Sequence, residues 1–170
     1  MTPQNKRKSA GTGAASGLEI RRATERDLGA AADLIVRTKK LNSEFDPLFS
    51  VVADAKERAD KYVASTLASK ERLLLVAVEK SKVVGVLRAE MRERTFYEPH
   101  REGFISDFYI LPEYRRKALG NEVLQYASAE LAKMGAQIIV ADVPSQNEIA
   151  YRFYTKRGFR SLTQIFGRNP

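Results

Sequence analysis

The amino-acid sequence predicts an α/β (α+β) fold with a mixed, mostly antiparallel central sheet and flanking helices. Short segments rich in valine and leucine alternate with longer segments whose apolar residues recur every three or four positions, as in amphipathic helices. Three strand-like segments follow one another directly, which indicates antiparallel pairing. A fourth is separated from the third by a helix, and such a crossover makes those two strands parallel.

The N-terminal part of the domain contains one strand and two helices. Residues Leu18 to Arg22 alternate like a strand. Thr24 and Asp27 have the spacing of a capping box, so we expect a helix from there through about Lys39. A second apolar stripe predicts a helix from about Asp54 to Ala68.

Three consecutive strands are expected next, at residues 72–79, 83–94 and 103–111. The first two are joined by Lys80-Ser81-Lys82, which is short enough for an antiparallel hairpin.

The C-terminal part alternates helices and strands. A helix from about Gly120 to Met134 meets a good stop signal in Gly135. A strand at 137–143, a short helix at about 147–156 and a last strand from Phe159 to Phe166 complete the predicted order.

Length and composition favour one domain. The chain has 170 residues, and residues 18–170 suit a single domain, whereas residues 1–17 lack acids and periodicity and are expected to form a disordered basic tail. The chain has no cysteine and one histidine, His100. Disulfides, thiolate metal sites and a multi-histidine centre are therefore excluded within one chain, and we expect no metal.

The net charge of +8 invites a nucleic-acid partner, but its distribution weakens that interpretation. Three of the charges lie in the basic tail, and no helix-turn-helix, zinc-finger or RNP pattern is present. Nucleic-acid binding is a secondary expectation. No long apolar run or signal-peptide core occurs, so we expect no membrane association and a cytoplasmic location.

A strand, a basic turn and a helix start follow one another between Phe108 and Gly120. The first amides of a helix have no partner inside it, and the helix dipole adds positive charge there. Arg115, Arg116 and Lys117 add full charges beside these amides. This combination predicts a site for pyrophosphate.

Two motifs give the chain a family resemblance. Arg115-x-x-Ala118-x-Gly120 resembles the cofactor-binding motif of the GNAT superfamily of N-acetyltransferases, with alanine where that family usually has glycine. A second segment resembles another signature of the family, namely Asn147-x-x-Ala150-x-x-Phe153-Tyr154 followed by Gly158-Phe159. The C-terminal half is similar to spermidine/spermine-type and protein N-acetyltransferases.

The resemblance implies a GNAT-like fold in which acetyl-CoA enters a gap between a splayed parallel strand pair. The strands at 103–111 and 137–143 hold that position. The implied coenzyme contacts are Phe108, Tyr109, Ile110, Arg115, Arg116, Lys117, Ala118, Leu119, Gly120, Asn121 and Asn147. A backbone N–H near Ile110 would polarise the thioester carbonyl. We expect weaker coenzyme binding if Ala118 departs from helical angles, because left-handed angles cost alanine about 1 to 2 kcal/mol.

Tyr154 stands at the position of the family's general acid, which protonates the departing thiolate. A phenol can serve, since its pKa of about 10 is close to that of a thiol, about 8.5. A core aromatic residue is the structural alternative, and Tyr151 is the fallback donor. Asn147 can bind the pantetheine, cap its helix, or both.

The second candidate catalytic residue is Asp107. The strand from Ile105 to Ile110 resembles that of spermidine/spermine acetyltransferases, which carry a Glu-Asp pair; Ser106 replaces the glutamate here. Asp107 could bind a cationic amine or relay a proton, or it could simply pair with a nearby arginine. Glu102 is the second candidate for a base.

The function expected is acetyl-CoA-dependent N-acetyl transfer to a primary amine by direct attack in a ternary complex. The acceptor is a small-molecule or protein amine, and acids among aromatics at Glu44, Asp46 and Glu98 suit a cation. Two alternatives remain: a catalytically degenerate acyl-CoA-binding or sensing module, and a basic nucleic-acid-binding domain. A homodimer is compatible with the resemblance.

Overall fold

The computed structural model describes residues 17–170, without the side chains of Arg116 and Lys117. The expected basic tail lies, except for Gly17, outside the described residues. Five strands form one sheet in the order of the chain: β1 (Leu18–Arg22), β2 (Arg72–Glu79), β3 (Lys82–Glu93), β4 (Arg101–Ile110) and β5 (Ile138–Ala141). β1 to β4 pair antiparallel, and β4 and β5 are parallel, as the sequence predicts.

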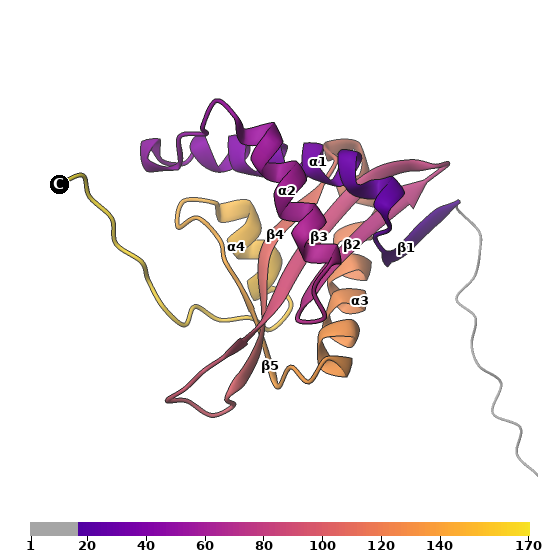
Figure 1. Ribbon diagram of the computed structural model, residues 1–170. Helices are drawn as coiled ribbons and strands as arrows, with labels where there is room; N and C mark the ends of the chain where they lie inside the picture. The colour runs from indigo at the N-terminus through magenta and orange to yellow at the C-terminus, as the bar shows by residue number, and fades with distance from the viewer. Residues whose placement is uncertain (1–16) are drawn as a thin grey trace, which may run out of the picture.

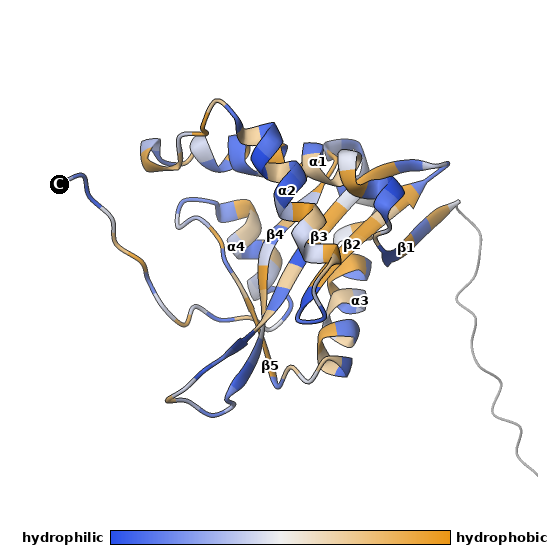
Figure 2. Cartoon of the chain, in the orientation of Figure 1, coloured by the Kyte–Doolittle hydropathy of each residue, from blue (hydrophilic) through white to orange (hydrophobic). Residues whose placement is uncertain are grey.

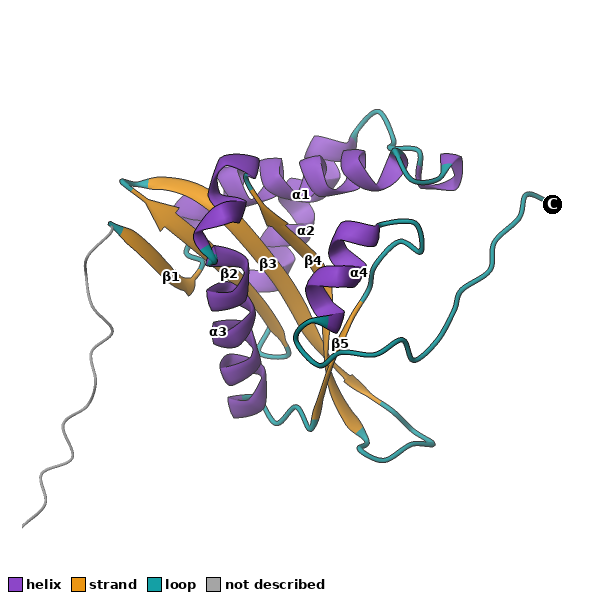
Figure 3. Cartoon of the chain, turned by 180° about the vertical axis from the view of Figure 1, so that it is seen from behind, coloured by secondary structure: helices purple, strands orange, loops and turns teal. Residues whose placement is uncertain are grey.

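Helices cover both faces of this sheet. The helices α1 (Leu28–Ser43) and α2 (Ala55–Leu67) lie on one face, and α3 (Leu119–Lys133) and α4 (Glu148–Thr155) lie on the other (Figures 1 and 3). Short 3-10 turns precede α1, α2 and α3; they are η1 (Glu25–Asp27), η2 (Pro47–Phe49) and η3 (Pro112–Lys117). The element order therefore matches the prediction through α4.

The core lies on both faces of the sheet around β2 and β3. β2 is buried throughout except at its ends, and Leu73, Leu75 and Val76 have no exposed surface. A strand covered on both faces needs a continuous apolar run, which explains why residues 73–78 do not alternate. Figure 2 shows these strands in orange beneath helices whose outward faces are blue.

Local signals fix the element ends that the sequence predicted. The Asp27 carboxylate accepts from the Thr24 N–H at 2.7 Å and from the Thr24 hydroxyl at 2.9 Å, which holds the turn that opens α1. Gly135 stops α3 with a φ of +97°, a conformation that favours glycine. Asn147 caps α4 by accepting from the Ala150 N–H at 3.0 Å.

The prediction of a last strand from Phe159 to Phe166 is wrong. Residues 159–166 form no strand, and the chain after Phe159 extends away from the sheet (Figure 1). The last backbone bond among the turns and loops that close this end of the fold is Phe159 N–H to Tyr154 C=O. Residue preferences indicate only that a segment suits a strand, and a strand forms when it also finds an edge to pair with.

Candidate active site

β4 and β5 separate halfway along β4. They pair from Glu102 with Ile138 to Ile105 with Ala141, and the Asp142 N–H makes one more bond to Ile105 C=O at 3.1 Å. β4 continues to Ile110, so its residues 106–110 have no partner from β5. The parallel pair thus opens into a gap bordered by free backbone.

A β-bulge marks the start of this gap. Arg88 of β3 pairs with Asp107, whereas the next residue, Ala89, pairs with Ile105, so Ser106 is the extra residue. After the bulge, the Leu111 N–H bonds to Val84 C=O on β3. Because backbone groups alternate along a strand, those of Ile110 face the open side.

The turn after β4 holds Ala118 in the left-handed conformation, with φ 57° and ψ 2°. This costs an alanine about 1 to 2 kcal/mol. The Ala118 carbonyl accepts from the Asn121 N–H at 2.9 Å and begins α3. The first amides of α3, at Leu119 and Gly120, therefore have no acceptor within the helix and are available to an anion.

Arg115 is turned back toward the strand. Its Nε donates to Ile110 C=O at 2.9 Å, and its guanidinium lies 5.3 Å from the centre of the Tyr109 ring. It therefore connects the basic turn to the open end of β4. The side chains of Arg116 and Lys117 lie outside the described residues, so their expected phosphate contacts stay predictions.

Gly120 allows α4 to approach the start of α3. A Cβ at this position would lie 3.1 Å from Cε2 of Phe153, closer than most real Cβ contacts. The Phe153 ring also packs edge-on against Phe108 at 5.7 Å. The motif glycine is thus explained by packing between the two helices and β4.

Tyr154 is buried beside these rings. It is 8% exposed and packs edge-on against Phe153 at 5.2 Å and Phe159 at 5.1 Å. Burial raises the pKa of its hydroxyl well above the usual value. The phenol is therefore protonated at neutral pH, and burial makes it a weaker acid than an exposed tyrosine.

Arg157 connects α3 to α4, and the sequence analysis did not single it out. Its Nε donates to Asn121 Oδ1 at 2.9 Å, its Nη1 donates to Phe153 C=O at 2.7 Å, and its guanidinium lies 3.8 Å from the centre of the Phe153 ring. It borders a hollow of about 370 Å³ between α3 and the end of α4, lined by Asn121, Leu124, Gln125, Ser128, Arg157 and Phe159. Its only sequence signal is its place before Gly158 in the second motif.

Asp107 points to the opposite face, beneath α1 and α2. Its side chain is fully buried and forms an ion pair with Lys39 at 2.5 Å. The hydroxyls of Tyr62 and Ser106 each donate to its Oδ2 at 2.9 Å. Its ionic partner is thus a lysine of α1, where the sequence alternative expected an arginine.

Arg88 completes this buried cluster. It is 3% exposed, donates to Thr66 Oγ1 and Ser106 Oγ at 2.9 Å each, and pairs with Glu90 at 3.0 Å. Its guanidinium also lies 4.0 Å from the centre of the Tyr62 ring. Burial, followed by the Asp107 charge, raises the pKa of Tyr62 to about 12.

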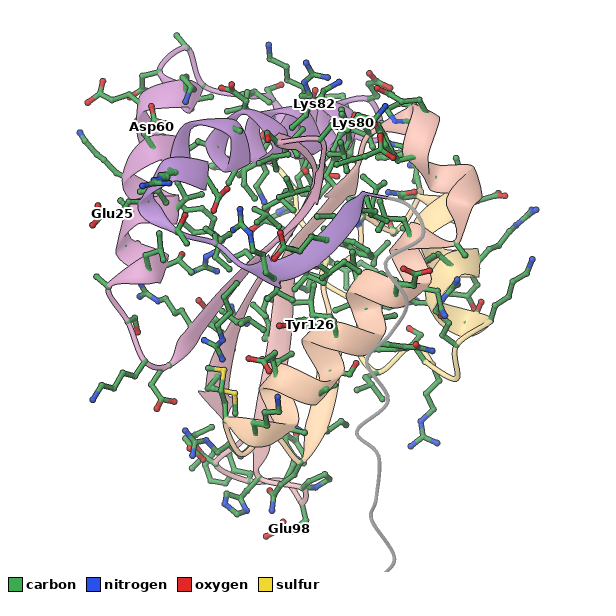
Figure 4. The ribbon with its side chains drawn as sticks, turned by 90° about the vertical axis from the view of Figure 1, so that its right-hand side faces the viewer. Glu25, Asp60, Lys80, Lys82, Glu98 and Tyr126 are labelled. Atoms are coloured by element: carbon green, nitrogen blue, oxygen red, sulfur yellow. The ribbon has the colours of Figure 1, made fainter. Side chains whose placement is uncertain are left out.

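The three acids that were expected to suit a cationic acceptor do not lie close together in the structure. Glu44 and Asp46 lie beside η2, whereas Glu98 lies at the far tip of the β3–β4 hairpin (Figures 1 and 4). Asp46 is also engaged, because its Oδ1 accepts from the Leu48 N–H at 2.8 Å. Glu102 pairs with Arg94 at 3.4 Å, about 16 Å along the strand from Asp107.

Two absences concern the described residues only. In the part of the chain that the structure describes, no cluster of three acidic, histidine or cysteine side chains could hold a metal ion. In residues 17–170, no helix is both long and apolar enough to cross a membrane.

The chain is similar to known acetyltransferases. It is 24% identical over 144 residues to an aminoalkylphosphonate N-acetyltransferase of Salmonella typhimurium, with 84% of each chain covered. The structure resembles an aminoglycoside 6'-N-acetyltransferase from Acinetobacter haemolyticus, with TM-score 0.70, 18% identity, and 89% and 97% of the two chains covered. It also resembles a predicted acetyltransferase from Clostridium acetobutylicum solved with acetyl-CoA, with TM-score 0.73, 17% identity, and 89% and 96% covered.

These two likenesses support the same fold, and the family match extends over the site. The model of the acetyltransferase (GNAT) family matches residues 38–159, which include the open end of β4, the turn at Ala118 and Tyr154. Acetyl-CoA is the acetyl donor of this family. The chain belongs to the acetyltransferase (GNAT) family and is an acyltransferase.

Proposed function

We propose that this chain moves an acetyl group from acetyl-CoA to a primary amine by direct attack of the amine in a ternary complex. The observation that carries the proposal is the side of β4 that β5 leaves without a strand partner at residues 106–110, next to the turn at Ala118 that opens α3. A thioester placed along this edge has an amide donor, an anion site and a proton donor around it.

The coenzyme would run along α3 and α4. The amides of Leu119 and Gly120, with Ala118 and Arg115 beside them, would receive the pyrophosphate, and Arg116 and Lys117 would add charge. The backbone of Phe108 and the N–H of Ile110 face the open side and would meet the pantetheine arm, whereas the backbone of Tyr109 faces β3. Two side chains of the implied set already have protein partners: Asn121 accepts from Arg157, and Asn147 accepts from Ala150. We propose that both act chiefly by holding α3 and α4 in place.

Three charges develop during the reaction, and each must be stabilised or neutralised. The amine attacks the carbonyl carbon, and the negative charge that develops on the carbonyl oxygen is met by the Ile110 N–H; such a donor typically contributes about 3 kcal/mol. The carbon–sulfur bond then breaks, and the thiolate takes the proton of the Tyr154 hydroxyl. The acetylated nitrogen loses one proton to solvent or to a base, which leaves a neutral amide, and solvent returns one proton to Tyr154.

Asp107 would assist the reaction without contacting the acceptor amine. With three donors on a buried carboxylate, it has no room to contact an amine directly. We propose that it holds Lys39, whose side chain is 45% exposed, and Tyr62 at the acceptor face, and that the Tyr62 hydroxyl, which donates to Asp107, passes a proton from the amine on to this carboxylate. In Asp107→Asn, kcat should fall at neutral pH and recover as the pH exceeds the pKa of the amine. Loss by the same factor at every pH would contradict this role.

The relatives suggest which amines to test first. The Salmonella relative is named for aminoalkylphosphonates, and the Acinetobacter structure for aminoglycosides. A panel should therefore contain one amine of each kind, a polyamine and a peptide. Because the chain has no cysteine, a thiol reagent would detect only coenzyme A released by the reaction. Acetyl-CoA-dependent thiol release with any of these amines would support the proposal.

The variant Tyr154→Phe tests the general acid. It should retain coenzyme affinity and lose most turnover, because the ring packing is kept and only the proton donor is removed. Tyr151→Phe is the matched control, since Tyr151 lies one turn earlier on α4 and is 56% exposed. Loss of turnover in Tyr151→Phe alone would assign the acid to Tyr151.

A second candidate function is the binding of acyl-CoA without turnover, and the observation behind it is Ser106, which stands where the spermidine/spermine acetyltransferases that the strand resembles carry a glutamate. The thermal midpoint with and without acetyl-CoA distinguishes the outcomes. At about 100 times the dissociation constant, one-site binding stabilises by roughly 2.7 kcal/mol. A clear rise without thiol release from any amine would support the sensing function. No rise at any concentration would contradict both candidates.

A further inference from the structure

A pocket of about 800 Å³, here called the α1 pocket, lies between β1, α1, the β2–β3 hairpin and the start of η3. α1 covers one face of the sheet, whereas α3 and α4, which border the proposed coenzyme site, cover the other face (Figures 1 and 3). The volume is within the range of small-molecule sites in proteins. The α1 pocket is therefore separate from the coenzyme site, and a ligand bound in it would not depend on acetyl transfer.

The buried lining of the α1 pocket is mostly aliphatic. Leu34 of α1 and Leu111 after β4 are 5% exposed, and Val78 of β2 is 9% exposed. The fourth buried residue that lines the pocket is Asp27, whose carboxylate already accepts from Arg21 at 2.7 Å. The base of the pocket thus offers an apolar surface to the organic part of a ligand.

Three exposed cations on the rim of the α1 pocket have no acidic partner in the part of the chain that the structure describes. They are Arg26 of η1, Arg37 of α1 and Lys80 in the turn of the β2–β3 hairpin. Residues 1–16 contain no aspartate or glutamate, so that segment has no acid to offer them. Their charge is therefore not neutralised by this chain.

The other acids of the α1 pocket are already paired with cations. The pairs are Glu19 with Arg21 at 3.6 Å, Asp33 with Lys56 at 3.2 Å and Glu113 with Lys82 at 3.9 Å. The three unpartnered cations consequently remain for a ligand. Several cations around one open pocket favour a group with more than one negative charge, such as a phosphate.

The hairpin turn holds Lys80 in a conformation that lysine seldom adopts. Lys80 and Ser81 have φ of 48° and 68°, as in the two-residue hairpin turns in which asparagine, aspartate and glycine predominate. Figure 4 shows Lys80 and Lys82 beside one another at this turn. Backbone strain of this kind is concentrated at binding sites, where the side chain contributes something that the backbone does not. At Lys80, that contribution is a free cation on the pocket rim.

We propose that the α1 pocket binds a small phosphate monoester. Arg37 and Lys80, from opposite walls, hold the phosphate, and the organic group lies on Leu34, Val78 and Leu111. The charge fits, because a phosphate monoester carries about −1.5 to −2 at pH 7. The apolar base distinguishes such a ligand from inorganic phosphate, which has no group to place there.

Phenyl phosphate is a suitable probe, because it joins a phosphate to an apolar ring. Titrated into the ¹⁵N-labelled full chain, it should cause saturable shifts of the amide signals of Leu34, Arg37 and Val83. Inorganic phosphate should bind about tenfold more weakly, since it buries no ring, and benzyl alcohol should cause no saturable shift. Equal affinity for the two phosphates, shifts confined to Leu119 and Gly120 at the coenzyme turn, or no saturable shift would each overturn the proposal.

Two glycine variants separate the charge of the hairpin turn from its strain. Lys80→Gly relieves the strain and removes the cation, so it should raise the thermal midpoint while weakening phenyl phosphate binding about tenfold. Ser81→Gly is the matched control. It relieves the neighbouring strain and keeps the cation, and should raise the midpoint with unchanged affinity. Unchanged affinity in Lys80→Gly, or the same loss in both variants, would overturn the proposal.

Arg37→Gln tests the opposite wall of the α1 pocket. It should also weaken phenyl phosphate binding about tenfold, with the fold retained because arginine and glutamine have similar helix propensities. Arg58→Gln is the control, since Arg58 is an exposed arginine of α2 outside the pocket and its loss changes the net charge equally. Equal weakening by the two variants would show long-range attraction without a site and would overturn the proposal.

Discussion

The ammonium of Lys39 lies 2.5 Å from the buried carboxylate of Asp107, and this ion pair fastens α1 to the centre of the sheet. Tyr62 of α2 bonds to the same carboxylate. Both helices that cover this face are therefore connected to one side chain, which sits beside the bulge where the strands begin to separate.

Replacing Asp107 with alanine should lower the free energy of unfolding by about 3 to 5 kcal/mol, because the buried donors around it lose their acceptor. Denaturant unfolding measures this. Asp60→Ala is the control, since Asp60 is exposed and its pair with Lys56 is of the kind that contributes under about 1 kcal/mol. A loss below 1 kcal/mol in Asp107→Ala would contradict the anchoring role.

Asp27 should make part of the stability depend on pH. The hydrogen bond from Arg21 is the main reason that the pKa of Asp27 falls from 3.8 to about 2. A pKa lowered by folding gives stability that is complete above the unfolded value and is lost as the pH falls from about 4 to about 2. In Asp27→Asn, this part of the acid dependence should disappear, with a loss of about 2 kcal/mol at pH 7. Unfolding curves recorded from pH 2 to 7 that keep the wild-type slope would argue against it.

Ala118→Gly should stabilise the protein by about 1 kcal/mol, since glycine adopts left-handed angles without the alanine penalty. The control is Ala127→Gly, a buried position inside α3, which should destabilise by about 1 kcal/mol or more. Thermal unfolding measures both changes. If the strain also weakens the anion site, calorimetry should record tighter acetyl-CoA binding in Ala118→Gly. A lower midpoint in that variant would mean that the methyl group makes contacts that outweigh the strain.

Arg157→Gln should weaken binding of coenzyme A about tenfold or more, because the α3 to α4 bridge and a cation beside the hollow are lost together. The pantetheine fragment, which would lie along β4 in the proposed arrangement, should bind with unchanged affinity. Lys156→Gln is the control, as the adjacent exposed cation. Calorimetry with both ligands provides the comparison, and equal losses for the two ligands would place Arg157 in general folding instead.

Local signals in the sequence were sufficient to predict the order of elements through α4, the caps at Thr24 and Asn147, the stop at Gly135 and the family motifs. Each of these signals acts within one or two turns of the chain, where neighbours in sequence are neighbours in space. The parallel pair could also be predicted, since a crossover through one helix leaves little choice of direction.

Contacts between residues far apart in the sequence could not be predicted in this way, because they depend on how the elements pack. Asp107 and Lys39 are 68 positions apart and their pairing depends on how α1 crosses the sheet, while Arg157 reaches Asn121 only because α4 packs against α3. For the same reason, Glu98 lies far from Glu44, and residues 159–166 have no strand partner. A residue's preference is local, whereas its partner is set by packing of the whole fold, and for this reason the sequence predicted the elements and only the structure assigned their contacts.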